Sequence, residues 1–168
     1  PAIAETARSQ DRMAERAKEI LGKDFLGTEA IKNMEVKLKA AGVQVEFSLD
    51  NIPQFPYSEQ DLQLAKQNGE MVVLRAENAR INGNSSPLTI MKFRELFRKD
   101  PVGSVATMFY SFKAGTNDWY TGEGFAIQPG EVKLGWAIVK KDLLPDSKSK
   151  TWNQQEEVLK QYGADLRT

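Results

Sequence analysis

The sequence predicts an α+β fold in a single domain over residues 1–168, with about four strands in a mixed or mostly antiparallel sheet and about five helices. Helical and strand-like apolar spacings follow each other in the order helix, helix, strand, helix, strand, helix, strand, strand, helix. The length of 168 residues suits one domain, and the hydrophobic share of 40% is typical of globular proteins.

The first predicted helix covers 5–21, where Met13, Ala17 and Ile20 recur at helical spacing, and Gly22 ends it. Its first two turns carry no large apolar residue. We therefore expect these turns to project from the body or to fray.

The second predicted helix runs from an N-cap at Thr28 to residue 41. A half-buried strand follows over 43–49, where apolar and polar residues alternate. Ser58 is expected to cap a third helix, because Asp61 stands three residues later, at the capping-box position.

A continuous apolar run at 71–74 predicts a strand that is covered on both faces. We therefore place this strand in the centre of the sheet. Residues 77–87 are rich in Asn, Gly and Ser and are predicted as turns. A helix from Thr89 to about residue 99 and a strand over 105–112 follow.

The longest predicted connection is a glycine-rich loop over 113–130. The next strand, 132–138, places Trp136 on its apolar face, where it is expected in the core. A capping box formed by Thr151 and Gln154 begins the last predicted helix.

The composition excludes several chemistries. The chain has no cysteine and no histidine, which excludes disulfides, thiol nucleophiles, Ser-His-Asp triads and metal sites built on those side chains. We expect no cofactor. The net charge of zero argues against a dedicated nucleic-acid binder. The chain shows neither a membrane-spanning apolar stretch nor a signal-peptide run, so we expect a cytoplasmic protein that does not bind membranes.

Aromatic residues gather around the 113–130 loop, since seven of the fifteen fall within 109–136. Aromatic faces beside carboxylates can bind a flat ligand or a partner's side chain. The candidate binding residues are Asp118, Trp119, Tyr120, Glu123 and Phe125. The structural alternative is that these rings are core residues, packed beneath a closed loop.

Two functions follow from this pattern. The first is a non-catalytic binding or protein-interaction module that uses the 113–130 loop to hold a protein partner or a second copy of the chain. The second is a small hydrolase that uses the carboxylates of Asp118 and Glu123. Residues 75–99 carry six basic and two acidic side chains, and 43–70 carry one basic and five acidic ones. Such complementary charge could steer a partner, although two ordinary solvated faces would look the same.

Several segments together resemble a family of bacterial proteins of unknown function. They are Ala17–Gly27, Ile52-Pro53, Pro56–Glu59, Trp119-Tyr120, Gly135-Trp136, Lys141–Ser147 and Lys150–Gln155. The resemblance spans most of the chain in order, apart from 75–112. It implies a cytoplasmic bacterial protein, and it identifies no active-site residue.

Overall fold

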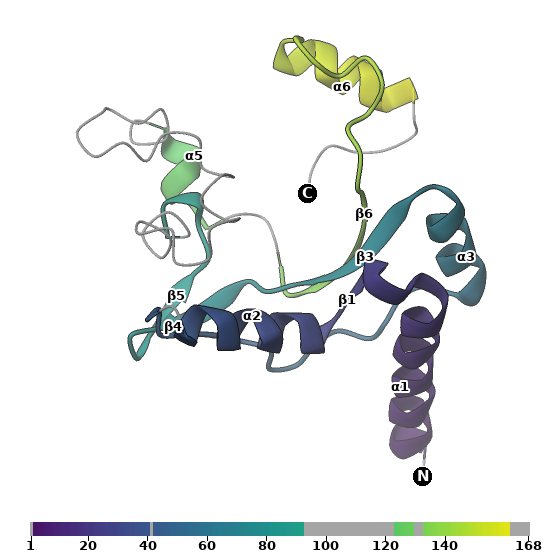
Figure 1. The fold of residues 1–168 in the computed structure, drawn as a ribbon, viewed down its shortest axis with the longest axis vertical. Helices are drawn as coiled ribbons and strands as arrows, with labels where there is room; N and C mark the ends of the chain where they lie inside the picture. Colours follow the sequence, from purple (N-terminus) through teal and green to yellow (C-terminus); the bar gives the residue numbers. More distant parts are fainter. Residues whose placement is uncertain (1, 41, 93–122, 130–132, 162–168) are drawn as a thin grey trace.

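The computed structural model describes residues 2–40, 42–92, 123–129 and 133–161, with side chains from Arg12 onward. It confirms an α+β fold, in which helices accompany two small sheets (Figure 1). The helices are α1 (Ala2–Leu21), η1 (Gly22–Asp24, a 3-10 turn), α2 (Thr28–Ala40), α3 (Glu59–Gln67), α5 (Gly124–Ile127) and α6 (Trp152–Gln161). The strands are β1 (Phe25–Leu26), β2 (Val45–Phe47), β3 (Glu70–Arg75), β4 (Asn78–Ile81), β5 (Asn84–Pro87) and β6 (Gly135–Lys140).

The first sheet has the order β1-β3-β6, so the prediction that residues 71–74 form a central strand is confirmed. β1 runs parallel to β3, whereas β6 runs antiparallel to it. Trp136 lies opposite Leu74 and Ile138 lies opposite Val72, which places all four side chains on one face of this sheet. That face carries the larger hydrophobic core.

The second sheet corrects two expectations. Residues 77–87 were expected as turns only, but they form the hairpin of β4 and β5, which pairs with β2 in the order β2-β4-β5. Asn82 and Gly83 have φ of 49° and 85°, which suits the two-residue turn that matches the twist of paired strands. Because this hairpin takes β2 as its partner, the described residues hold six strands in two sheets rather than about four in one.

Capping chemistry fixes the starts of several helices. The Ser58–Asp61 capping box is confirmed, with Asp61 N donating to Ser58 Oγ and Ser58 N to Asp61 Oδ2. The Thr151–Gln154 box is confirmed in the same way, and Thr89 Oγ1 accepts from Lys92 N. Residues 90–92 are helical, as expected, and the rest of that helix and the strand at 105–112 lie outside the described residues.

The predicted cap at Thr28 is wrong. The amides of Ala30 and Ile31 both donate to the carbonyl of Gly27, so Gly27 precedes the first turn and Thr28 lies inside it. At the other end of α2, Gly42 has φ of 84°. Its amide donates to the carbonyl of Lys39, and the amide of Val43 donates to the carbonyl of Leu38. This pattern is a glycine C-cap.

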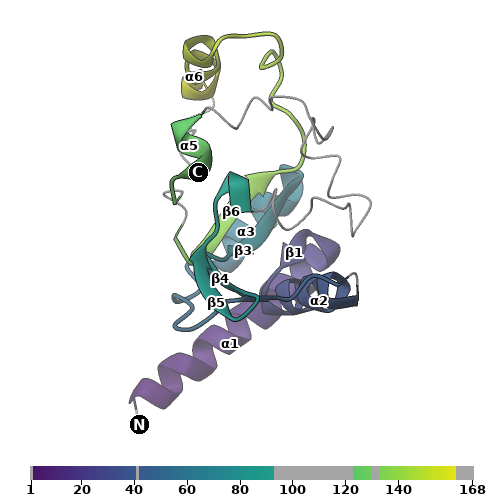
Figure 2. The same ribbon diagram turned by 90° about the vertical axis from the view of Figure 1, so that its left-hand side faces the viewer.

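Two hydrophobic clusters join the helices α1, α2 and α3 to the two sheets. The larger joins α1 and α3 to one face of β3, and its fully covered members are Ala17, Leu62 and Val72. The smaller joins α2 to the second sheet through Leu38, Val45, Ala79 and Ile81. Turning the view by 90° shows the N-terminal half of α1 extending away from the other elements (Figure 2).

The region after residue 122 also differs from expectation. Residues 124–127 of the predicted 113–130 loop form the short helix α5. β6 begins at Gly135, so residues 133 and 134 of the predicted strand do not belong to it, and residue 132 lies outside the described residues. Trp136 lies on the side of β6 that faces the core, as expected, because its partly buried side chain packs against the larger cluster.

Candidate functional site

The structure places only part of the predicted aromatic site. Asp118, Trp119 and Tyr120 lie outside the described residues, so their arrangement stays a prediction. Glu123 is half-buried directly before α5, and Phe125 lies in α5 with 49% of its surface exposed. The hydrolase alternative also stays a prediction, because one of its two carboxylates lies in the undescribed segment.

A different aromatic cluster is well placed to bind a ligand. It joins Phe25 of β1, Phe55 of the segment before α3 and Trp136 of β6. The rings of Phe25 and Trp136 are stacked, with centroids 5.7 Å apart and an interplanar angle of 19°. The ring of Phe55 meets Trp136 edge-on at 5.0 Å. Offset and edge-on contacts of this kind favour one fixed arrangement of the rings.

Gly27 allows the chain to pass close to this cluster. A Cβ at residue 27 would lie 2.9 Å from Cε1 of Phe25 and 3.5 Å from Cη2 of Trp136. Only glycine avoids the shorter contact while β1 turns directly into α2. The indole Nε1 of Trp136 donates to the carbonyl of Pro53 at 3.2 Å, which meets the polar requirement of the ring and ties β6 to the segment before α3.

These rings form the wall of an open cavity of about 380 Å³, which we call the aromatic groove. Ile52, Pro53, Ala14 and Thr28 also line the cavity. Its charged lining residues are Glu15 and Lys18 of α1 and Glu29 of α2. Nζ of Lys18 lies 2.5 Å from Oε2 of Glu29, and this hydrogen bond lowers the pKa of the Glu29 carboxyl. The groove therefore joins an aromatic wall to an ionised rim.

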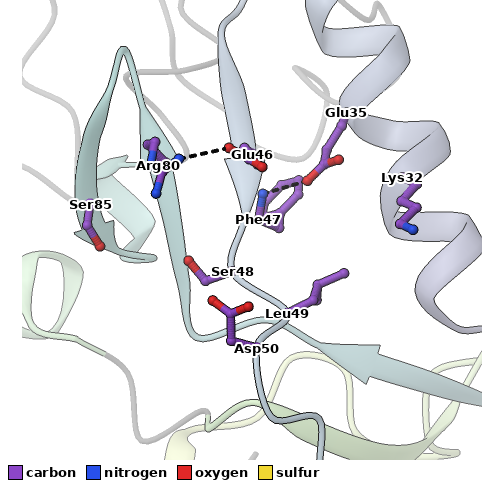
Figure 3. Close-up of a pocket in the computed structure, with 9 residues that line it drawn as sticks. All are labelled: Lys32, Glu35, Glu46, Phe47, Ser48, Leu49, Asp50, Arg80 and Ser85. Atoms are coloured by element: carbon purple, nitrogen blue, oxygen red, sulfur yellow. Dashed lines mark hydrogen bonds and ion pairs between the residues drawn. The ribbon is translucent and has the colours of Figure 1, made fainter.

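A second cavity of about 290 Å³, the hairpin pocket, lies between α2, β2 and the β4–β5 hairpin (Figure 3). Its lining is mostly polar: Lys32, Glu35, Glu46, Phe47, Ser48, Leu49, Asp50, Arg80 and Ser85. Two of its carboxylates have partners within the protein. Glu46 pairs with Arg80 at 3.4 Å, and Oε1 of Glu35 accepts from the amide of Phe47 at 2.6 Å.

The contact of Glu35 explains part of the polar lining. β2 is an edge strand of its sheet, and the Phe47 amide receives its acceptor from a side chain of α2. Glu35 thus has a structural role that protects a strand edge. Among the residues that the structure describes, no three acidic side chains are grouped so that they could hold a metal ion.

Sequence reasoning missed the aromatic groove. Phe55 belongs to the segment 53–56 that precedes α3, and this segment is not helical. A large apolar side chain between two prolines in a polar loop was a usable signal, since Phe55 is 9% exposed. Phe25 gave a weaker signal, because β1 is only two residues long.

Within the described part of the chain, no helix has the length and apolar character needed to cross a membrane. Comparison of the chain with protein-family models, curated proteins and solved structures gives no match.

Proposed function

We propose that this protein is a non-catalytic binding module whose aromatic groove accepts an apolar side chain from a segment of a partner protein. The observation that supports this function most strongly is the joining of three aromatic rings into the wall of an open cavity with charged residues at its rim. Interfaces in which an apolar anchor is surrounded by polar groups have the same anatomy.

The construction of the groove favours recognition of an apolar anchor. The volume of about 380 Å³ lies within the range of ordinary ligand sites, and the groove is open, as access for a protein segment requires. The rings are held by their mutual contacts and by the bond from Trp136 to Pro53. A wall that is already ordered loses little conformational entropy when a ligand binds.

Selection from a phage-displayed library of random peptides tests this proposal. The immobilised full chain should enrich peptides that share one large apolar residue. Ala14→Trp adds an indole to the lining of the groove, so it should weaken binding of the selected peptides by about tenfold or more, as the loss of an interface anchor does.

Gln63→Trp is the matched control, because it adds the same ring at an exposed position of α3 outside the groove lining. It should leave peptide binding unchanged. The proposal is wrong if the selection enriches no apolar anchor, or if both variants bind the selected peptides as the wild type does.

We also keep the 113–130 loop as a proposed contributor to binding. The exposed ring of Phe125 in α5 supports this role. If Trp119 and Tyr120 point to opposite sides of an extended stretch, alanine at the outward ring should weaken peptide binding by at least about 1 kcal/mol without loss of stability. Alanine at the inward ring should lower the free energy of unfolding. If both substitutions only destabilise the protein, the loop is structural.

A further inference from the structure

We infer that the segment bound by the aromatic groove carries a basic residue beside its apolar anchor, and that Glu15 selects this residue. This inference rests on the proposed function and assigns a partner chemistry to the same groove. The structural basis is the balance of charge among the lining residues, together with the partners that each of them already has.

The groove lining holds two carboxylates and one ammonium group. Lys18 and Glu29 are paired across the rim, which joins α1 to α2. Glu15 is exposed and makes no ion pair among the described residues. The surplus charge at the rim is therefore negative, and it is located on Glu15.

The neighbouring arginine on α1 has its own partners. Arg16 bonds Glu19 at 2.7 Å and Glu59 at 2.8 Å, so it is held toward α3. Arg12 lies one turn before Glu15, is exposed, and is not part of the groove lining. Glu15 thus remains available to a cation that arrives with the ligand.

The position of Glu15 suits a residue next to the anchor in the partner. Glu15 and Ala14 of α1 line the same cavity as the three aromatic rings, so a segment bound there lies close to Glu15. A segment that inserts an apolar side chain between the rings would present its neighbouring residues to this carboxylate. Complementary charge at a rim contributes mainly to specificity and association rate.

The test repeats the peptide selection on charge variants of the full chain. The wild type should enrich Lys or Arg within two positions of the apolar anchor. Glu15→Lys should instead enrich Asp or Glu there, and Glu15→Gln should remove the charge preference while the apolar anchor is still enriched. The affinity of a selected basic peptide should fall about two- to fivefold in Glu15→Gln, as expected for an exposed ion pair.

Glu156→Lys is the matched control, since it makes the same change at an exposed position of α6 outside the groove lining, and Glu156 makes no ion pair among the described residues. It should leave the preference for basic residues intact. If apolar anchors are enriched without any charge preference, or if Glu15→Lys selects the same basic peptides as the wild type, this inference fails and the proposed function stands. If no apolar anchor is enriched at all, both fail.

Discussion

At the scale of single residues, Trp136 links the core to the groove. Its side chain packs against the larger cluster, stacks on Phe25 and bonds the carbonyl of Pro53. Its position on the apolar side of β6 could be predicted from the alternation of apolar residues with other residues along the strand. Its contacts with Phe25 and Pro53 could not, because each comes from a distant segment.

We expect Trp136→Ala to lower the free energy of unfolding by about 3 kcal/mol, the lower end of the cost of truncating a core aromatic residue, because the ring is only partly buried. Chemical denaturation measures this loss. Trp152→Ala is the control, since Trp152 is 62% exposed in α6, and it should change stability by less than about 0.5 kcal/mol. A loss below about 1 kcal/mol for Trp136→Ala would contradict its place in the packed cluster.

Gly27→Ala should destabilise the protein by about 1–3 kcal/mol, since the added methyl group would overlap the Phe25 ring and that ring is held by Trp136 and Phe55. Thermal unfolding followed by circular dichroism detects the change. Gly124→Ala tests the specificity of this effect, because a Cβ at Gly124 meets nothing within 4 Å. Equal destabilisation by both substitutions would show that steric contact at residue 27 is not the cause.

At the scale of elements, the edge of β2 depends on one side chain of α2. Glu35→Ala leaves the amide of Phe47 without its acceptor, so we expect a loss of about 1–2 kcal/mol in the free energy of unfolding. Glu35→Gln keeps an acceptor oxygen and should lose less. Denaturation of the two variants in parallel separates the hydrogen bond from the charge, and an equal loss in both would mean that the charge is what matters.

The start of α3 gives stability that depends on pH. Hydrogen bonds from the hydroxyl and amide of Ser58 lower the pKa of Asp61 below its ordinary value of 3.8. Because the folded state holds Asp61 ionised, its contribution to stability is complete above that value and is lost as the pH falls through the lowered pKa.

The difference in Tm between the wild type and Asp61→Asn should therefore be constant from about pH 6 to pH 8 and shrink below about pH 4. Asp142→Asn controls for the loss of one negative charge at an exposed position. A difference that stays constant down to about pH 3 would show that the carboxylate is not the group responsible.

At the scale of the whole molecule, each of the two sheets has its own hydrophobic cluster. β3 leads into β4 through residues 76 and 77 only, so the two sheets are closely joined along the chain. If they fold as the single domain that the sequence predicts, truncation in either cluster should weaken one common transition.

Leu38→Ala in the smaller cluster and Leu62→Ala in the larger one remove fully buried side chains, and each should cost about 2–5 kcal/mol. In both variants, tryptophan fluorescence and far-ultraviolet circular dichroism should follow the same unfolding curve. Separate transitions, with each substitution shifting a different one, would divide the chain into two folding units.

The sequence by itself determined the features that depend on neighbouring residues. The capping boxes at Ser58–Asp61 and Thr151–Gln154 involve groups three positions apart, and the continuous apolar run identified β3 as a central strand. The capping boxes can be predicted because their interacting groups lie within one turn of the chain. The central place of β3 can be predicted because an unbroken apolar run requires cover on both faces of the sheet. Asn82-Gly83 is also a local signal, because both residues adopt the positive φ that a two-residue hairpin turn requires.

Only the tertiary structure decided which distant segments meet. The pairing of β2 with β4, the need for glycine at residue 27 and the meeting of Phe25, Phe55 and Trp136 depend on contacts between separate elements. Local preferences do not specify these contacts, because many pairings of short apolar segments would bury similar surface. Packing of the complete set of elements selects one of them, and the aromatic groove is a consequence of that selection.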